Sequence, residues 1–199
     1  MSLITVLTPT IPGRADLLER ATASVKDQTI VDRQIRHVTF TDSRGLGPAF
    51  ARDSMLAEVT TPWVAFLDDD DEFMPAHLEV LFDSAMRHRA DYVFSWYQVE
   101  GGTDPRANEF GLEWDRENPR QTTITTLVRT SVALAAGGFS AVVDDLDDPD
   151  RVYSGEDWRF TQRVNALGAK IHHLPVKTWV WHHHGRNTSG LPKNARNLY

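Results

Sequence analysis

Several features that would point to other classes of protein are missing from this sequence. It contains no cysteine, so disulfide bonds and thiolate metal sites are excluded. No apolar run approaches the roughly 18–20 residues that a helix needs to cross a bilayer. The start, residues 1–6, has no basic segment followed by a long apolar one, so no secretory signal is evident. We therefore expect a cytoplasmic protein without a membrane span.

An excess of positive charge is also missing. The chain has 21 Lys and Arg against 28 Asp and Glu, which gives a net charge of −7 and a pI near 5.6. Without a long basic stripe it cannot neutralise a run of phosphates, so nucleic-acid binding is not expected. A local basic pocket for one small phosphate group is still open. A chain of 199 residues with 41% apolar side chains is long enough for one domain with a sizeable core.

The most informative feature that is present is the acidic run that ends residues 63–72. A short apolar segment stops abruptly at four aspartates and a glutamate. Adjacent carboxylates repel one another, so a cation or wide solvation must screen them. An EF-hand loop does not fit, because the alternating acids and the central glycine are missing. The run therefore predicts either a metal site at the tip of a buried strand or a solvated acidic turn.

The first hundred residues alternate between strand-like and helix-like patterns. This order implies an α/β protein with a Rossmann-like, mostly parallel central sheet and helices on both faces. Ligands of such a sheet bind outside the carboxyl ends of its strands. The expected strands are 3–8, 35–41, 63–67 and 92–99, and the expected helices are 16–27, 48–58 and 76–88.

The second half of the chain is less regular, and no repeat or linker divides it from the first. The stretch 143–152 carries five aspartates, and we expect it to be a solvated loop. A single compact domain over 1–199 is therefore predicted. The other expected elements are a long polar loop over 101–121, strands at 122–129, 170–173 and 178–182, and helices at 130–136 and 156–167.

Several different short motifs are spread along the chain, from the first expected strand to its last residues. They are 4–10 with Arg14 and 24–29, the segment 47–53, the DxD-like 66–71, the pair 137–139 and 155–157, and the loop 184–190. Each is weak alone, but their order and spacing are specific. Together they resemble the GT-A-fold glycosyltransferases, most of all the family-2-type inverting enzymes. The resemblance implies a nucleotide-sugar-binding half over 1–100, an acceptor-binding half over 101–190 and a tail over 191–199.

Three departures from the family pattern concern the donor side. The first loop has Ile11, Pro12 and Gly13 where an aromatic residue and Asn are common, and the second strand ends in one acid, Asp42, where two are usual. Asp53 stands where Asn usually follows the arginine. The first two departures leave the nucleotide base unassigned.

The resemblance implies a divalent ion, Mn²⁺ or Mg²⁺, which would stabilise charge on the leaving nucleoside diphosphate. The implied metal ligands are Asp70, as the last acid of the DxD motif, and His184. Asp68 is then the nearer donor contact. The register stays open, since residues 69–71 also read as DxD, and we expect Asp71 and Glu72 to be solvated. His182 and His183 are expected to pack in the core or lie on the surface.

The remaining donor contacts are also implied by the resemblance. Residues at the tips of the first two strands would line the nucleoside, and two arginines would meet its base or phosphates. Each arginine fits a surface salt bridge equally well. These predicted contacts are Thr8, Pro9, Thr10, Arg14, Asp42, Arg52 and Asp69.

The resemblance makes Asp157 the catalytic base, which removes the proton of the acceptor hydroxyl. Its position at the start of a helix favours the ionised form and would lower its basicity. Glu156 is the expected acceptor contact, and Trp158 would stack on a sugar. Without the family motifs, simple stabilisation of the helix N-terminus explains both acids better.

The implied function is a metal-dependent, hexosyltransferase-like transfer of a sugar from a nucleotide-diphosphate donor to an acceptor hydroxyl, with inversion. A UDP-sugar is favoured as the donor, and the acceptor is unknown. One alternative is a nucleotidyltransferase acting on a sugar phosphate, although residues 10–14 hold a single glycine where such enzymes have a glycine-rich loop. Another is an inactive nucleotide- or metal-binding module. The sequence does not indicate the sugar, the acceptor or the oligomeric state.

Overall fold

The computed structural model describes residues 2–30, 35–140 and 155–183. Within these residues the strands form one seven-stranded sheet in the order β2-β1-β3-β6-β5-β7-β4. The strands are β1 Ile4–Thr10, β2 Ile35–Thr41, β3 Trp63–Phe66, β4 Glu72–Phe73, β5 Tyr92–Glu100, β6 Thr126–Arg129 and β7 Ile171–His182. The helices are α1 Ala15–Lys26, α2 Pro48–Leu56, α3 His77–His88, the single 3₁₀ turn η2 Ala107–Glu109, α4 Thr130–Ala135 and α5 Glu156–Ala166.

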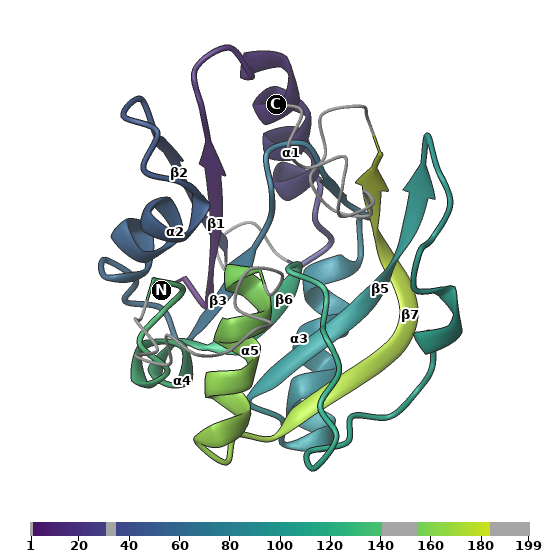
Figure 1. Cartoon of the computed structure of the whole chain (residues 1–199). Helices are drawn as coiled ribbons and strands as arrows, with labels where there is room; N and C mark the ends of the chain where they lie inside the picture. The colour runs from purple at the N-terminus through teal and green to yellow at the C-terminus, as the bar shows by residue number, and fades with distance from the viewer. Residues whose placement is uncertain (1, 31–34, 141–154, 184–199) are drawn as a thin grey trace, which may run out of the picture.

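The predicted α/β architecture, with a central sheet between helices, is confirmed. Helix α5 crosses one face of the sheet and α3 covers the other (Figure 1). The ladders β1–β2, β1–β3 and β5–β7 are parallel, whereas β6 pairs antiparallel with both β3 and β5, and β4 antiparallel with β7. The β-prone segment predicted over 122–129 thus becomes the strand that joins the two parallel parts of the sheet.

Strand β1 runs two residues further than predicted, through Pro9 to Thr10. The pairing with β3 ends at Leu7, whereas the pairing with β2 continues to Thr10. Pro9 therefore stands at a local edge of the sheet, where a missing backbone N–H is tolerated. The extension brings the side chain of Thr10 to the acidic run that follows β3.

The two short strands predicted near the end of the chain are one strand, β7. Ser95 pairs with Leu174 but Trp96 pairs with Lys177, so the register shifts across Pro175 and Val176. Such a bulge absorbs a proline within a paired strand. Beyond it, β5 and β7 stay paired as far as Glu100 and His182, and they form one wall of the cleft described below.

The core lies between the sheet and the helices on its two faces. All four residues of β3 are buried, at 0–2% exposure, and so are the first six residues of β5, at 0–6%. Phe160 of α5 packs against Phe66 of β3 and stacks on Phe139, with ring centroids 5.9 and 4.4 Å apart. These contacts fix the start of α5 against the carboxyl end of β3.

Candidate active site

A cleft of about 550 Å³ opens at the carboxyl ends of β1 and β3. Its walls come from the donor-side loops and α2, and from β5, β7, the loop after β5 and the start of α5. Its lining includes most of the predicted site residues: Pro9, Thr10, Arg14, Asp42, Arg52, Asp68, Asp69, Asp70, Glu156 and Asp157. Residues far apart in the sequence therefore converge on one cavity, which is the typical form of a ligand site.

Three carboxylates gather in the tight turn after β3. Asp68, Asp70 and Asp71 each offer an oxygen atom, and these atoms lie within 4.8 Å of one another. The backbone N–H of Asp71 donates to the carbonyl of Asp68 at 3.2 Å, which closes the turn. Hard divalent cations prefer such oxygen ligands, so this cluster fits a Mg²⁺ or Mn²⁺ ion.

The expectation that Asp71 is solvated is wrong. Asp71 is only 3% exposed, and its Oδ1 accepts a hydrogen bond from the backbone N–H of His182 at 3.2 Å. Burial, together with the negative charges of Asp68 and Asp70, raises its pKa well above the ordinary value. Glu72 differs again, because it is half-buried and pairs with Arg20 at 2.9 Å and with His182 at 2.7 Å. The sequence did not reveal Asp71, since a run of acids does not show which members the turn buries.

Asp69 takes no part in the carboxylate cluster. Its Oδ2 accepts from the Thr10 hydroxyl at 2.6 Å and its Oδ1 from Arg14 at 2.8 Å. Arg14 also lies 3.5 Å from Asp70. Asp69 therefore ties the acidic turn to the end of β1. The Asp68-x-Asp70 register keeps both outer acids in the cluster, whereas the 69–71 register would start from Asp69, which lies outside it.

Arg52 forms buried ion pairs, so the alternative that it makes a surface salt bridge is wrong. At 3% exposure, it donates to Asp68 at 2.5 Å and to Glu156 at 2.8 Å. Burial alone would lower the pKa of its guanidinium, but the two carboxylates outweigh burial and raise it. Its guanidinium carbon also lies 5.2 Å from the centre of the Phe139 ring. The arginine thus links the acidic turn after β3 to the start of α5.

Asp53, which stands where the family usually has Asn, holds the loop beside Arg52. Its two oxygens accept hydrogen bonds from the backbone N–H groups of Phe139 and Ser140, both at 2.7 Å. A carboxylate offers two such acceptors, whereas an amide offers one oxygen. Gly138 has φ +66°, and a Cβ there would lie 2.2 Å from an Asp53 oxygen. Gly138 is therefore needed for this close approach.

Asp157 lies in the first turn of α5 and lines the cleft. Its Oδ1 accepts from the backbone N–H of Trp158 at 2.7 Å. Burial, and then the charge of Glu156, raise its pKa above the ordinary value. The expectation that the helix start lowers its basicity is therefore wrong, because loss of solvent outweighs the helix dipole. A raised pKa makes this carboxylate a better proton acceptor.

Other predicted residues take different places. Thr8 is fully buried and bonds to the His37 ring at 2.9 Å, outside the cleft lining. Asp42 lines the cleft, but its oxygens already accept from the backbone N–H groups of Arg44 and Gly47, at 3.1 and 2.7 Å. Trp158 is half-buried and is not among the lining residues. His184 and the stretch 143–152 lie outside the described residues.

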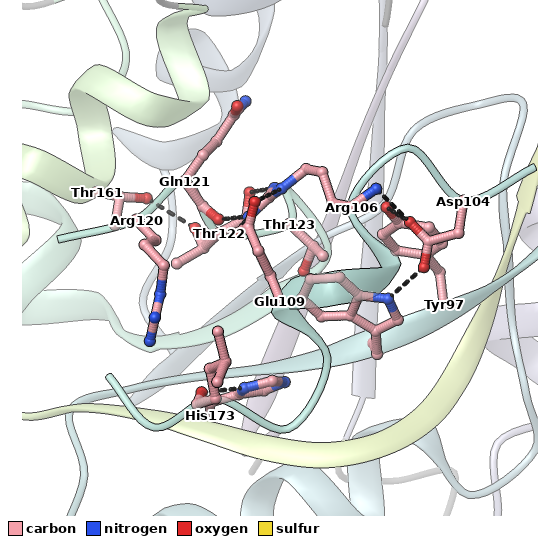
Figure 2. A network of polar contacts seen from close by, with 12 residues as sticks. Tyr97, Asp104, Arg106, Glu109, Arg120, Gln121, Thr122, Thr123, Thr161 and His173 are labelled. Carbon is pink, nitrogen blue, oxygen red and sulfur yellow. Dashed lines mark hydrogen bonds and ion pairs between the residues drawn. The ribbon is translucent and has the colours of Figure 1, made fainter. Parts of the chain in front are cut away.

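The loop after β5 is held firmly over the far wall of the cleft. Asp104 accepts hydrogen bonds from the Trp96 indole and the Tyr97 hydroxyl, both at 2.7 Å, and from the backbone N–H of Arg106 at 2.8 Å. Figure 2 shows Asp104 against Tyr97, with the Arg106 side chain reaching toward Gln121 and Thr122. Arg106 also pairs with Glu109 at 2.7 Å. The sequence analysis placed this polar loop in the expected acceptor-binding half but did not single out its lining residues Pro105, Arg106 and Gln121.

Comparison with solved structures defines the class. The chain shares the GT-A fold with the N-terminal 1–349 part of S. aureus TarS in complex with UDP, at TM-score 0.74 and 17% identity over 91% of this chain. The same part of TarS with UDP-GlcNAc matches at TM-score 0.72 and 15% identity over 93%. Mannosyltransferase PcManGT from Pyrobaculum calidifontis, in complex with GDP-Man and Mn²⁺, matches at TM-score 0.64 and 16% identity over 92%. The chain spans about three fifths of these solved chains, 60, 60 and 58% respectively.

The family follows from the sequence comparison. The model of glycosyl transferase family 2 matches residues 31–148, which is more than half of the chain. The chain belongs to glycosyl transferase family 2. A search of curated proteins finds no significant match. In the part of the chain that the structure describes, no helix has both the length and the apolar character needed to cross a membrane.

Proposed function

We propose that this protein transfers a sugar from a nucleotide-diphosphate donor to an acceptor hydroxyl, with inversion at the anomeric carbon. The observation that carries the proposal is the convergence of the acidic turn after β3 and Asp157 on one cleft, joined by the buried Arg52. Membership of glycosyl transferase family 2 supports it. The fold is shared with proteins solved with UDP, UDP-GlcNAc and GDP-Man, which supports a nucleotide-sugar donor.

The two halves of the cleft suit the two substrates. Residues between Pro9 and Asp71 line the side that would hold the donor, and residues between Tyr97 and Trp181 line the side that would hold the acceptor. Pro9 and Thr10 would contact the nucleoside, with Asp42 shaping the loop beside it. This division agrees with the proposed boundary near residue 100 within a single domain.

A divalent ion fits the acidic turn. Three carboxylates so close together repel one another, and the raised pKa of Asp71 reflects that repulsion and burial. Asp70 is the central proposed ligand, with Asp68 and Asp71 beside it and His184 as a further candidate. When bound, the ion supplies Lewis-acid stabilisation of the charge that collects on the diphosphate. PcManGT was solved in complex with both GDP-Man and Mn²⁺, which supports this assignment.

Arg14 and Arg52 would then have different roles. Arg14 lies at the edge of the acidic turn, is partly exposed and faces the cleft, so it suits a contact to a phosphate oxygen. Arg52 is buried and holds Asp68 and Glu156 with its two terminal nitrogens, so we assign it a positioning role. Glu156 in turn is held by Arg52, which leaves less of its carboxylate for the acceptor than the sequence pattern implied.

The chemical step needs one proton transfer. The acceptor oxygen attacks the anomeric carbon from the side opposite the diphosphate, the new C–O bond forms, and the bond to the diphosphate oxygen breaks. The Asp157 carboxylate takes the proton of the attacking hydroxyl. Its raised pKa makes the ionised carboxylate a stronger proton acceptor, which favours the transfer.

The test combines binding with product analysis. Melting temperature is measured with UDP, GDP, CDP and dTDP, each with and without Mn²⁺, because a ligand that binds the native state raises it by mass action. One nucleotide should raise it only with the metal, and Asp70→Ala should abolish that rise. Asp83→Ala, which removes an exposed acid on α3, is the matched control.

The corresponding nucleotide sugar is then incubated with an acceptor mixture. Release of nucleoside diphosphate with an inverted glycoside as product supports the proposal. Formation of nucleoside triphosphate and sugar 1-phosphate when pyrophosphate is added would indicate a nucleotidyltransferase, and the absence of any metal-dependent shift would refute the donor site.

A further inference from the structure

One wall of the cleft that Asp157 also lines carries aromatic side chains from two paired strands. Tyr97 of β5 pairs with Trp179 of β7, and Val99 pairs with Trp181. The Tyr97 ring centre lies 5.1 Å from that of Trp179 and 5.6 Å from that of Trp181. Side chains alternate along a strand, so Trp179 and Trp181 share the cleft face, while Thr178 points to the opposite face and bonds to His77.

This wall also holds an unused hydrogen-bond donor. Trp179 is 3% exposed, and its buried indole N–H has no partner among the described residues. A buried donor without a partner costs about 1–3 kcal/mol. Thr122 and Thr123 line the same part of the cleft. That N–H is closed to solvent, so a ligand meets the aromatic rings and the threonines beside them. Such a surface suits a molecule with both C–H faces and hydroxyl groups.

The charges around the wall disfavour an anionic ligand. Of the described residues that line this half, Arg106 is the only cation, and its guanidinium is already bound to Glu109 and to the backbone carbonyls of Gln121 and Thr122. Glu156 and Asp157 add negative charge close by. A phosphorylated or carboxylated acceptor would meet two acids and no free cation there.

We propose that Tyr97, Trp179 and Trp181 form an acceptor subsite for a neutral saccharide. The half-buried Trp181 offers its ring to the C–H face of the sugar, since the negative face of an aromatic ring attracts such weakly positive hydrogens. The buried Trp179 ring supports this wall through its contact with Tyr97. The inference rests on the proposed glycosyl transfer and narrows its acceptor to an uncharged sugar. The sequence analysis expected Trp158 to stack on a sugar, and we now assign that stacking to Trp181.

The experiment measures saccharide binding by calorimetry and by ligand-observed saturation-transfer NMR, with Mg²⁺ and UDP or GDP present. The neutral ligands are cellobiose, maltose, lactose and diacetylchitobiose; the anionic ones are glycerol 3-phosphate, ribitol 5-phosphate and glucuronate. At least one neutral disaccharide should bind, with saturation transferred to its ring C–H groups. Trp181→Ala should weaken binding at least tenfold, and Trp181→Phe less.

Trp114→Phe is the matched control. Trp114 packs on Phe94, donates to Asn165 and does not line this cleft, so its replacement should leave saccharide binding unchanged. The nucleotide-dependent rise in melting temperature, measured on every variant, separates the two proposals. Suppose that the nucleotide-dependent rise is intact. The subsite is then refuted, while the donor site stands, if no neutral saccharide binds, if anionic ligands bind better, or if Trp181→Ala binds saccharide normally. If the nucleotide rise is absent, Trp181-dependent saccharide binding would still support the subsite.

Discussion

Arg52 and Glu156 are 104 positions apart in the sequence, yet a 2.8 Å ion pair joins them. The other arm of the same guanidinium holds Asp68 at 2.5 Å. Arginine suits this position because its planar fork presents two donors at a fixed angle, whereas a lysine ammonium is a single point of charge. The side that would bind the donor and the helix that carries Asp157 are therefore set relative to each other by one buried side chain.

Replacing Arg52 should separate positioning from folding. Arg52→Lys keeps a positive charge but cannot hold both carboxylates, so we expect kcat to fall at least tenfold with the fold intact. Arg52→Ala should lower the free energy of unfolding by about 3 kcal/mol, since breaking a buried pair leaves its partners uncompensated. Urea unfolding and steady-state kinetics measure the two effects. Arg129→Lys, which alters an exposed pair with Asp91, should cost under about 1 kcal/mol; an equal loss at both arginines would contradict the positioning role.

Asp157→Asn should lower kcat by about 10²–10⁴-fold, the usual contribution of a general base. Because the asparagine has nearly the same shape, the nucleotide-dependent rise in melting temperature should be unchanged. In the unaltered protein the base must be ionised to accept a proton, so kcat/KM should fall as pH falls through the pKa of Asp157. Burial raises that pKa, so the midpoint should lie above the ordinary value of 3.8. Turnover that survives the substitution would remove Asp157 from the mechanism.

Gly155 is the residue whose missing side chain leaves room for Asp157. A Cβ at position 155 would lie 2.5 Å from the Asp157 Oδ1 atom, so any substitution must displace the carboxylate. Gly155→Ala should therefore lower kcat by about tenfold or more, in line with the steep cost of small misplacements. Gly155 is also the N-cap of α5, where Ala is unfavourable but Ser is favourable. Gly155→Ser should restore the stability lost in Gly155→Ala without restoring kcat, and recovery of both would assign the effect to capping alone.

Most of the elements could be predicted from the sequence because their patterns are local. The amphipathic helices α1, α3 and α5 begin and end within a residue or two of the predicted bounds. The long-range choices could not be predicted. Nothing in residues 122–129 indicates that β6 inserts antiparallel between β3 and β5, and the bulge that keeps β7 continuous across Pro175 depends on its pairing with β5.

The same limit applies to the site. The sequence motifs located Asp68, Asp70, Arg52 and Asp157, all of which the fold brings to one cleft. They could not show that Asp71 is buried or that Asp69 turns away to Thr10, because adjacent acids in a turn differ only in direction. Trp179 and Trp181 escaped notice because their shared role depends on the register between β5 and β7.

Asp71→Asn tests the cost of the acidic turn. The folded state raises the pKa of this carboxyl, so ionised Asp71 destabilises the fold above that pKa, and the penalty disappears as pH falls below its unfolded value. Asparagine keeps the acceptor for the His182 N–H but carries no charge. Without divalent ions at neutral pH, Asp71→Asn should raise the melting temperature by a few degrees, and Mn²⁺ should then raise it much less than in the unaltered protein. A variant less stable than the parent without metal would contradict the burial argument.

The loss of folding stability at acidic pH should depend in part on His77. This ring is fully buried, stacks on Phe73 and bonds through Nδ1 to Thr178, while its Nε2 has no partner among the described residues. Burial lowers its pKa from 6.5 to about 3. The unfolded chain therefore takes up a proton below pH 6.5 that the folded chain refuses, so stability is full above pH 6.5 and falls as pH decreases toward 3.

The expected contribution of His77 is about 1.4 kcal/mol per pH unit, or about 2 kcal/mol between pH 6.5 and 5. Urea unfolding at several pH values measures this slope, which is informative even if a variant is less stable throughout. His77→Gln should reduce the slope by that amount, because glutamine does not titrate. His183→Gln, which changes a half-buried ring beside Trp181, is the control and should leave the slope unchanged. If His77→Gln has the same slope as the parent protein, the imidazole must already be protonated in the fold or open to solvent, and the neutral, buried assignment is wrong.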